Sequence, residues 1–156
     1  MRTILMISYC LLAYSLSAQV KFNSGDADLD KDLETINTNA KSDLPAFHAE
    51  LSASFGVTSK NIEYMTSIKM EPAEIYFALE IAAAIGKPVE EVVSTYEKNR
   101  DKGWGYVAQQ MGIKPGSAEF HALKGKSKTK KEKVSKGNGN GSTPSSAPGN
   151  TGRKKK

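Results

Sequence analysis

Glycine and proline interrupt the stretch from residue 43 to residue 123 at short intervals, and the apolar residues between them recur every three or four positions. This spacing places apolar side chains on one face of an α-helix. Glycine commonly ends a helix and proline suits its first turn, so these residues predict the helix boundaries. No run alternates apolar and polar residues for long enough to predict a strand. We therefore expect an all-α fold, a compact bundle of five or six short helices.

Residues that favour a helix start stand where the apolar spacing begins. Asp43, Thr58 and Ser117 can each accept a hydrogen bond from a free backbone N–H of a first helical turn. Pro72 and Pro88 suit the first helical position. The side chains expected on the buried faces are Leu44, Phe47, Leu51, Phe55, Ile62, Met65, Ile75, Ala78, Leu79, Ala82, Ile85, Val89, Val92, Val93, Tyr96, Trp104, Val107, Ala108 and Met111.

Composition divides the chain into four parts. The expected parts are a signal peptide at 1–18, an irregular lead-in at 19–28, a helical domain at 29–123 and a disordered Lys/Gly/Ser-rich basic tail at 124–156. A more polar helix is expected at 29–41, at the start of the domain. The only cysteine is Cys10, which precedes the domain, so the core must be stabilised without disulfides.

The N-terminus has the composition of a cleavable secretory signal. Arg2 precedes an apolar run at 4–16, and the small residues Ser17 and Ala18 follow it. Such a run is typically about 7–15 residues long, whereas a membrane-spanning helix needs about 20. The alternatives are an uncleaved anchor or a buried helix. We predict an exported protein, periplasmic or secreted, with no transmembrane span after cleavage.

Charge is strongly segregated along the chain. Residues 19–123 carry ten Lys and Arg against sixteen acids, a net of −6, whereas residues 124–156 carry eleven against one, a net of +10. Val134 is the only large apolar residue in the second stretch. Because so little apolar surface can be buried there to offset the entropy of ordering, residues 124–156 are predicted to be disordered.

The predicted tail attracts polyanions without sequence specificity and in a salt-dependent way. We expect it to contact an anionic surface or polyanion, while any protein partner stays unknown. The candidate contact residues are Lys126, Lys128, Lys130, Lys131 and Lys133. Two alternatives remain open: the tail only solubilises the protein, or it folds back on the acidic domain.

The segment at 103–117 reads Gly-Trp-Gly-Tyr-Val-Ala-Gln-Gln-Met-Gly-Ile-Lys-Pro-Gly-Ser. It resembles a group of small, uncharacterised secreted bacterial proteins that share the pattern Gly-Trp-Gly-x-[Ile/Val]-Ala-x-x-[Leu/Met]-Gly-Ile-x-Pro-Gly-Ser. The similarity covers about twenty residues firmly and 59–102 only loosely. It implies export from a bacterial cell, and it supplies no activity and no site residues.

The same segment is similar to half of a helix-turn-helix, with Gly112 in the turn and a capped helix after Ser117. Phe120 and His121 would then open a recognition helix. The predicted export, the acidic domain and the shortness of the predicted second helix argue against this interpretation. We expect no sequence-specific nucleic-acid binding.

Trp104 stands between Gly103 and Gly105 and supports two interpretations. Its helical spacing to Val107 favours a core anchor. The alternative is an aromatic platform that, with Tyr106, forms a ligand pocket, as in an envelope enzyme or a small-ligand carrier.

Other chemistry-bearing residues give no specific signal. Asp26 begins an alternating acidic run, but Lys31 and Asn37 occupy the calcium-loop positions that need glycine and glutamate. His48 and His121 are the only histidines, and no nucleophile motif accompanies them. We predict no catalytic residues, no metal site and no cofactor. The expected function is that of an exported, non-enzymatic helical interaction module whose basic tail contacts anionic envelope components.

Overall fold

The computed structural model describes residues 21–137, which form seven α-helices and one short 3-10 helix. The elements are α1 (Ala27–Ala40), α2 (Leu44–Phe55), α3 (Ser59–Ser67), α4 (Pro72–Ile85), α5 (Val89–Lys98), η1 (Arg100–Lys102), α6 (Trp104–Gln110) and α7 (Ala118–Gly137). This stretch contains no strand, which confirms the all-α prediction with one helix more than expected. The predicted signal peptide at 1–18 and the last part of the predicted tail, 138–156, lie outside the described residues.

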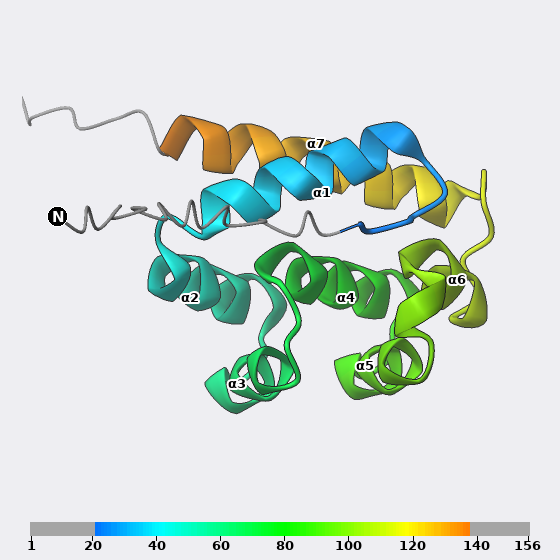
Figure 1. Ribbon diagram of the computed structural model, residues 1–156, viewed down its shortest axis with the longest axis horizontal. Coiled ribbons are helices and arrows are strands. Elements are labelled where there is room, and N and C mark those ends of the chain that lie inside the picture. Colours follow the sequence, from blue (N-terminus) through cyan, green and yellow to red (C-terminus); the bar gives the residue numbers. More distant parts are fainter. Residues whose placement is uncertain (1–20, 138–156) are drawn as a thin grey trace, which may run out of the picture.

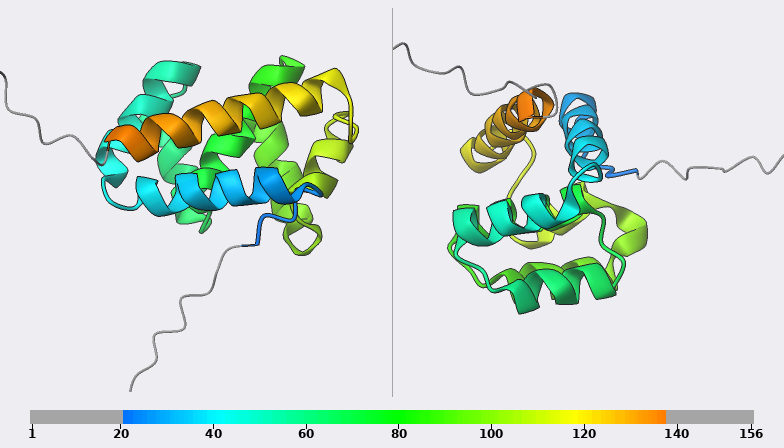
Figure 2. Two further views of the ribbon diagram at one scale, coloured as in Figure 1. Left: turned by 90° about the horizontal axis from the view of Figure 1, so that it is seen from above. Right: turned by 90° about the vertical axis from the view of Figure 1, so that its left-hand side faces the viewer.

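The helices lie in three tiers (Figure 1). α1 and α7 lie side by side in one tier, α2, α4 and α6 form the middle tier, and α3 and α5 lie on the other side. The two views in Figure 2 also show α7 beside α1. A contact between Lys124 and Asp26 joins the starts of these two helices, and one between Ser135 and Asn39 joins their ends. The two helices therefore run in the same direction.

The three predicted side-chain caps are present, and the Ser117 hydroxyl accepts a hydrogen bond from Phe120 N–H at 3.2 Å. The carboxylate of Asp43 accepts a hydrogen bond from Ala46 N–H at 3.0 Å, and the hydroxyl of Thr58 accepts one from Asn61 N–H at 3.3 Å. Gly56 ends α2 with a φ of +65°, a backbone conformation that favours glycine. Leu44, expected on a buried face, is instead 38% exposed. Local cap chemistry thus sets where these helices begin and end.

α4 is the central helix of the core. Its residues are buried from Pro72 to Ala82 on every side, whereas the apolar spacing predicted a single buried face. Helices α1, α2, α3, α5 and α7 all contact it. At its start, the carboxylate of Glu74 accepts a hydrogen bond from Glu71 N–H at 2.8 Å.

The predicted lead-in is irregular only up to Asp26, where α1 is capped, and it is part of the core. Phe22 is 2% exposed, and its carbonyl accepts a hydrogen bond from Trp104 N–H at 2.8 Å. The carbonyl of Asn23 accepts another from Gly105 N–H at 2.9 Å. The N-terminal segment is therefore held against the first turn of α6.

The two glycines beside Trp104 make this close approach possible. A Cβ at Gly105 would lie 2.6 Å from the carbonyl oxygen of Ser24, and a Cβ at Gly103 would collide with Asn23. Gly103 also has a φ of +79°, which other residues rarely adopt. Both glycines therefore face the protein's own N-terminal segment, which fits the favoured interpretation of Trp104 as a core anchor and not the alternative of a ligand platform.

The predicted disorder is wrong for residues 124–137, which are helical and belong to α7. The predicted domain boundary at residue 123 is wrong for the same reason. The helix after Ser117, which was expected to be very short, is twenty residues long. Leu123 and Ser127 are 0% exposed, and Lys130 is 7% exposed. Composition indicated too little apolar surface for order, but lysine can bury its methylene chain while its ammonium group finds a carboxylate. Within residues 21–137, no helix is both long and apolar enough to cross a bilayer.

Candidate binding surfaces on helix α7

The lysines of α7 divide into two groups, and the first group forms ion pairs with acids of other helices. The pairs are Lys124–Asp26 at 2.6 Å, Lys126–Glu80 at 2.8 Å, Lys130–Glu50 at 2.5 Å and Lys131–Asp32 at 2.5 Å. For residues 124–137, the open alternative that the tail folds back on the acidic domain is the arrangement observed. Three of the five lysines predicted to contact an external anion are thus engaged internally.

Lys130 is the most buried of these lysines. Its side chain is 8% exposed, and its ammonium group lies 4.6 Å from the ring centroid of Phe47 and 5.9 Å from that of Tyr76. A buried charge is costly unless it is paired, and the Glu50 carboxylate supplies the partner. Lys130 therefore joins α7 to α2 and α4, and it is not available to an external anion.

The second group of lysines faces solvent. Lys128, Lys133 and Lys136 are exposed, and none of them forms an ion pair with another residue of the stretch 21–137. Among the predicted contact residues, only Lys128 and Lys133 belong to this group. Lys136 has the same environment and was not among them.

A groove runs between α2 and α7, with α4 as its floor. Its volume is about 730 Å³, and its charged lining includes Glu50, Glu80, Lys126, Lys130 and Lys133. The apolar and small lining residues are Leu51, Phe55, Tyr76, Ala83, Ala122 and Gly125. Sequence reasoning missed this groove because three separate segments form it. One local signal was present: Phe120, Leu123, Ser127 and Val134 continue the helical spacing into the predicted tail.

Burial affects the chemistry of the groove floor. Burial, together with the nearby Glu80 carboxylate, raises the pKa of the Tyr76 phenol far above its usual value. Tyr76 is therefore a neutral hydrogen-bonding group at physiological pH. It is not a candidate base or nucleophile.

Trp104 is a core residue, as its helical spacing predicted. It is 1% exposed, and its ring stacks on Tyr96 with 4.8 Å between centroids and meets Phe77 edge-on at 5.5 Å. Its indole N–H donates to the buried Glu74 carboxylate at 3.2 Å, and Tyr96 O–H donates to the same oxygen at 2.9 Å. Burial and the Glu74 charge raise the pKa of Tyr96 well above its usual value. Trp104 therefore presents no face to a ligand.

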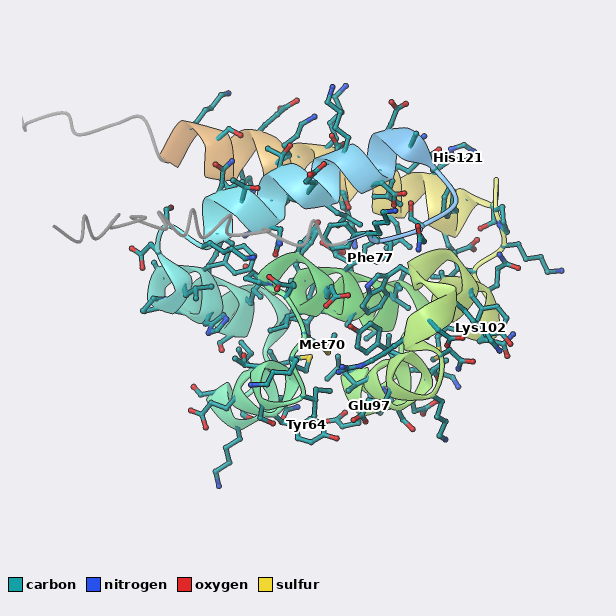
Figure 3. All side chains as sticks on the ribbon, in the orientation of Figure 1. Tyr64, Met70, Phe77, Glu97, Lys102 and His121 are labelled. Carbon is teal, nitrogen blue, oxygen red and sulfur yellow. The ribbon has the colours of Figure 1, made fainter. Side chains whose placement is uncertain are left out.

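Tyr106 has a different environment. It lines an open hollow of about 480 Å³ together with Asp26, Lys102, His121 and Lys124. The two lysines are already engaged, because the Lys102 ammonium group lies 4.4 Å from the Tyr106 ring centroid and Lys124 pairs with Asp26. Figure 3 shows Lys102 and His121 at the end of the molecule where α6 and the start of α7 lie. Of the two aromatic residues of the predicted ligand pocket, Tyr106 lines an open hollow, whereas Trp104 is buried in the core.

The acidic run near residue 26 has structural roles. The Asp26 carboxylate accepts a hydrogen bond from Leu29 N–H at 2.9 Å and caps α1, and Asp30 accepts one from Ser24 N–H at 2.9 Å. Within residues 21–137, no group of three or more His, Cys, Asp or Glu side chains is placed to hold a metal ion. Burial lowers the pKa of His48.

The packing of α7 argues against the helix-turn-helix interpretation. Phe120, which would open the recognition helix, is 8% exposed and belongs to the core. α7 is packed along α1, with which it makes extensive contact. Phe120 is therefore not free to enter a DNA groove.

In comparisons with known proteins, no family model, curated protein or solved structure matches this chain. The resemblance of residues 103–117 to a group of secreted bacterial proteins stays a prediction. The residues and geometry described above are the basis for assigning a function.

Proposed function

We propose that this protein is a non-enzymatic helical interaction module that contacts an anionic surface through its C-terminal region. The observation that carries the proposal is the division of the α7 lysines. Four of them are neutralised by Asp26, Asp32, Glu50 and Glu80, whereas Lys128, Lys133 and Lys136 are exposed and form no ion pair within residues 21–137. The exposed lysines are therefore the ones we assign to external contact.

The charge that remains after internal pairing still favours an anionic partner. Residues 124–156 carry eleven basic side chains, and seven remain when the four paired lysines are set aside. Besides the three exposed lysines, these seven are the four basic residues at 153–156, and Glu132 is the only acid of the region. The same ion pairs neutralise four negative charges of the acidic domain. The uncompensated charge of the molecule is thus concentrated at its C-terminal end.

The proposed setting is outside the cytoplasm, in the periplasm or the medium. The support for it is the sequence of residues 1–18 and the resemblance of residues 103–117. The matching partner is an anionic lipid headgroup or another anionic envelope polymer. Each lysine near an anionic membrane surface contributes about 1 kcal/mol to binding at moderate salt.

The test compares two triple variants of the protein, purified as the expressing cell processes it. In the first, Lys128, Lys133 and Lys136 are changed to Gln. In the control, the exposed Lys60, Lys98 and Lys114 are changed to Gln, which removes the same charge elsewhere. Deletion of residues 124–156 is a poorer test, because it would remove part of a packed helix.

Both variants are assayed for retention on phosphatidylglycerol-containing vesicles and on neutral vesicles, at low and high salt. We expect the first variant to bind anionic vesicles about 100-fold more weakly at low salt, from about 3 kcal/mol for three lysines. The control should lose little affinity. Equal losses in the two variants would show that only net charge matters, and unchanged retention in both would overturn the proposal.

A further inference from the structure

The groove between α2 and α7 has a defined direction. Lys126 pairs with Glu80, and Lys130, one turn further along α7, lies over the ring of Tyr76, one turn earlier in α4. α7 therefore runs antiparallel to α4. Lys130 also pairs with Glu50, which places the middle of α2 beside the same point.

These contacts give the groove two chemically different ends. Toward the start of α7 it is lined by the small residues Ala122 and Ala83, and the ring of Phe55 lines its α2 side, 6.3 Å from the ring of Tyr76. Toward the end of α7 it is lined by Lys133 and by the Lys130–Glu50 pair. The eleven helical steps from Ala122 to Lys133 span about 17 Å at 1.5 Å per residue. The groove is therefore elongated, with small residues at one end, the Lys126–Glu80 pair along its wall and Lys133 at the other end.

The charged end is uncompensated and positive. Lys126 and Lys130 each have a carboxylate partner in the groove, Glu80 and Glu50. Lys133 is exposed and pairs with no residue of the stretch 21–137. The lining thus carries one net positive charge, located at the end opposite Ala122.

We propose that this groove binds a single-chain amphipathic monoanion, such as a long-chain carboxylate. Its apolar chain lies along Phe55, Ala83 and Ala122, and its head group meets Lys133. A volume of about 730 Å³ lies within the range of roughly 300–1,000 Å³ typical of small-ligand sites. The proposal shares Lys133 with the surface contact above and differs from it in requiring a monomeric ligand and a cavity, which the surface contact does not.

Gly125 offers a direct way to fill the groove. A Cβ added there has no atom within 4 Å, so the helix can accept a side chain that projects into open space. In the variant Gly125→Leu, the new side chain occupies the wall between Ala122 and Lys126. Ala122→Leu fills the same channel from the next turn and serves as a second blocking variant. Both variants keep every charge of the protein.

The experiment measures binding of tetradecanoate below its micelle concentration, by calorimetry and by amide chemical shifts. We expect saturable binding, with shifts at Phe55, Ala83 and Ala122. Tetradecyltrimethylammonium, which has the same chain and a cationic head, and acetate, which lacks the chain, should both bind at least tenfold more weakly. Both blocking variants should abolish binding while they keep the helical circular dichroism of the wild type and unfold at a temperature no lower than the wild type does.

A matched pair of lysine variants tests the head-group position. Lys133→Gln should weaken tetradecanoate binding about tenfold, as expected for loss of a hydrogen bond to a charged group. Lys128→Gln, on the same helix but outside the groove, should leave binding unchanged. Equal binding of the cationic detergent, or retained binding in folded Gly125→Leu, would overturn the proposal. A second copy of the chain that covers the groove would also overturn the proposal. Sedimentation would show it as a dimer, and Gly125→Leu would dissociate that dimer.

The blocking variants also separate this proposal from the surface contact. Gly125→Leu should retain binding to anionic vesicles, since it leaves Lys128, Lys133 and Lys136 in place. Loss of tetradecanoate binding with normal vesicle retention is the expected result.

Discussion

Glu74 and Lys130 are two buried charged groups that contact aromatic side chains, and they are stabilised in different ways. Glu74, between α4, α5 and α6, accepts hydrogen bonds from three neutral donors: Tyr96 O–H, Trp104 N–H and the backbone N–H of Glu71. Lys130, between α2, α4 and α7, relies on the Glu50 carboxylate, whose side chain is 47% exposed. Neutral hydrogen bonds in a packed core respond little to salt, whereas partly exposed ion pairs are screened by it.

The comparison indicates how stability is distributed. The region around Glu74 combines neutral hydrogen bonds with the packed rings of Phe77, Tyr96 and Trp104. Residues 124–137 of α7 have one large apolar side chain, Val134, and four ion pairs. We therefore expect residues 124–137 to open before α4, α5 and α6.

The largest effect is expected from Trp104→Ala. This change removes a buried ring from the core and leaves the Glu74 carboxylate with one donor fewer. The free energy of unfolding should fall by about 3–5 kcal/mol. Denaturant unfolding measures it, with Tyr106→Ala, half-buried beside the hollow, as the control that should cost less. Similar losses in the two variants would contradict the core role of Trp104.

An intermediate effect is expected from Gly105→Ala. The added Cβ would lie 2.6 Å from the Ser24 carbonyl oxygen, so the N-terminal segment must move away from α6. We expect a loss of about 1–3 kcal/mol of unfolding free energy. Gly125→Ala is the matched control, and it should raise the free energy of unfolding. Open space surrounds the added Cβ, and alanine favours the helix over glycine by up to about 1 kcal/mol. Thermal unfolding of both variants should show shifts in opposite directions.

The smallest effect concerns pH and the start of α7. The hydrogen bond from Lys124 lowers the pKa of Asp26, and the same contact raises the pKa of Lys124. Because the folded pKa of Asp26 lies below its unfolded value of about 3.9, its stabilisation is present above that pH. It is lost as the pH falls through the folded pKa.

Asp26→Asn isolates this contribution, since asparagine can still cap α1 while the charge pair is removed. At pH 6 the free energy of unfolding of the variant should be lower than that of the wild type, by less than about 1 kcal/mol, as for other solvent-accessible ion pairs. The difference should disappear when both are measured below the folded pKa of Asp26. A difference that persists in acid would show that capping, and not the ion pair, accounts for the effect.

Local sequence rules predicted the helices between residues 43 and 123 well. The buried stripe of α5, for example, is the predicted set Val89, Val92, Val93 and Tyr96. Caps and apolar spacing act within one helical turn, so a single segment contains the information. The same reasoning predicted that Trp104 is a core residue.

The partners of the lysines could not be predicted in the same way. Lys130 and Glu50 are 80 residues apart, and Lys131 and Asp32 are 99 apart. A composition argument treats residues 124–137 as an isolated chain, in which lysines repel one another and apolar area is too small for folding. Opposed by four carboxylates on α1, α2 and α4, the same lysines hold a helix in place.

The sequence by itself therefore determined the all-α class, the helix boundaries of the central region and the segregation of charge. Each of these depends on neighbours within a few positions or on composition. The tertiary structure alone decided that α7 extends to Gly137, which lysines stay free, and that a groove lies between α2 and α7. These features depend on which distant helices meet, and a pairwise contact has no local signature until the chain has brought both partners together.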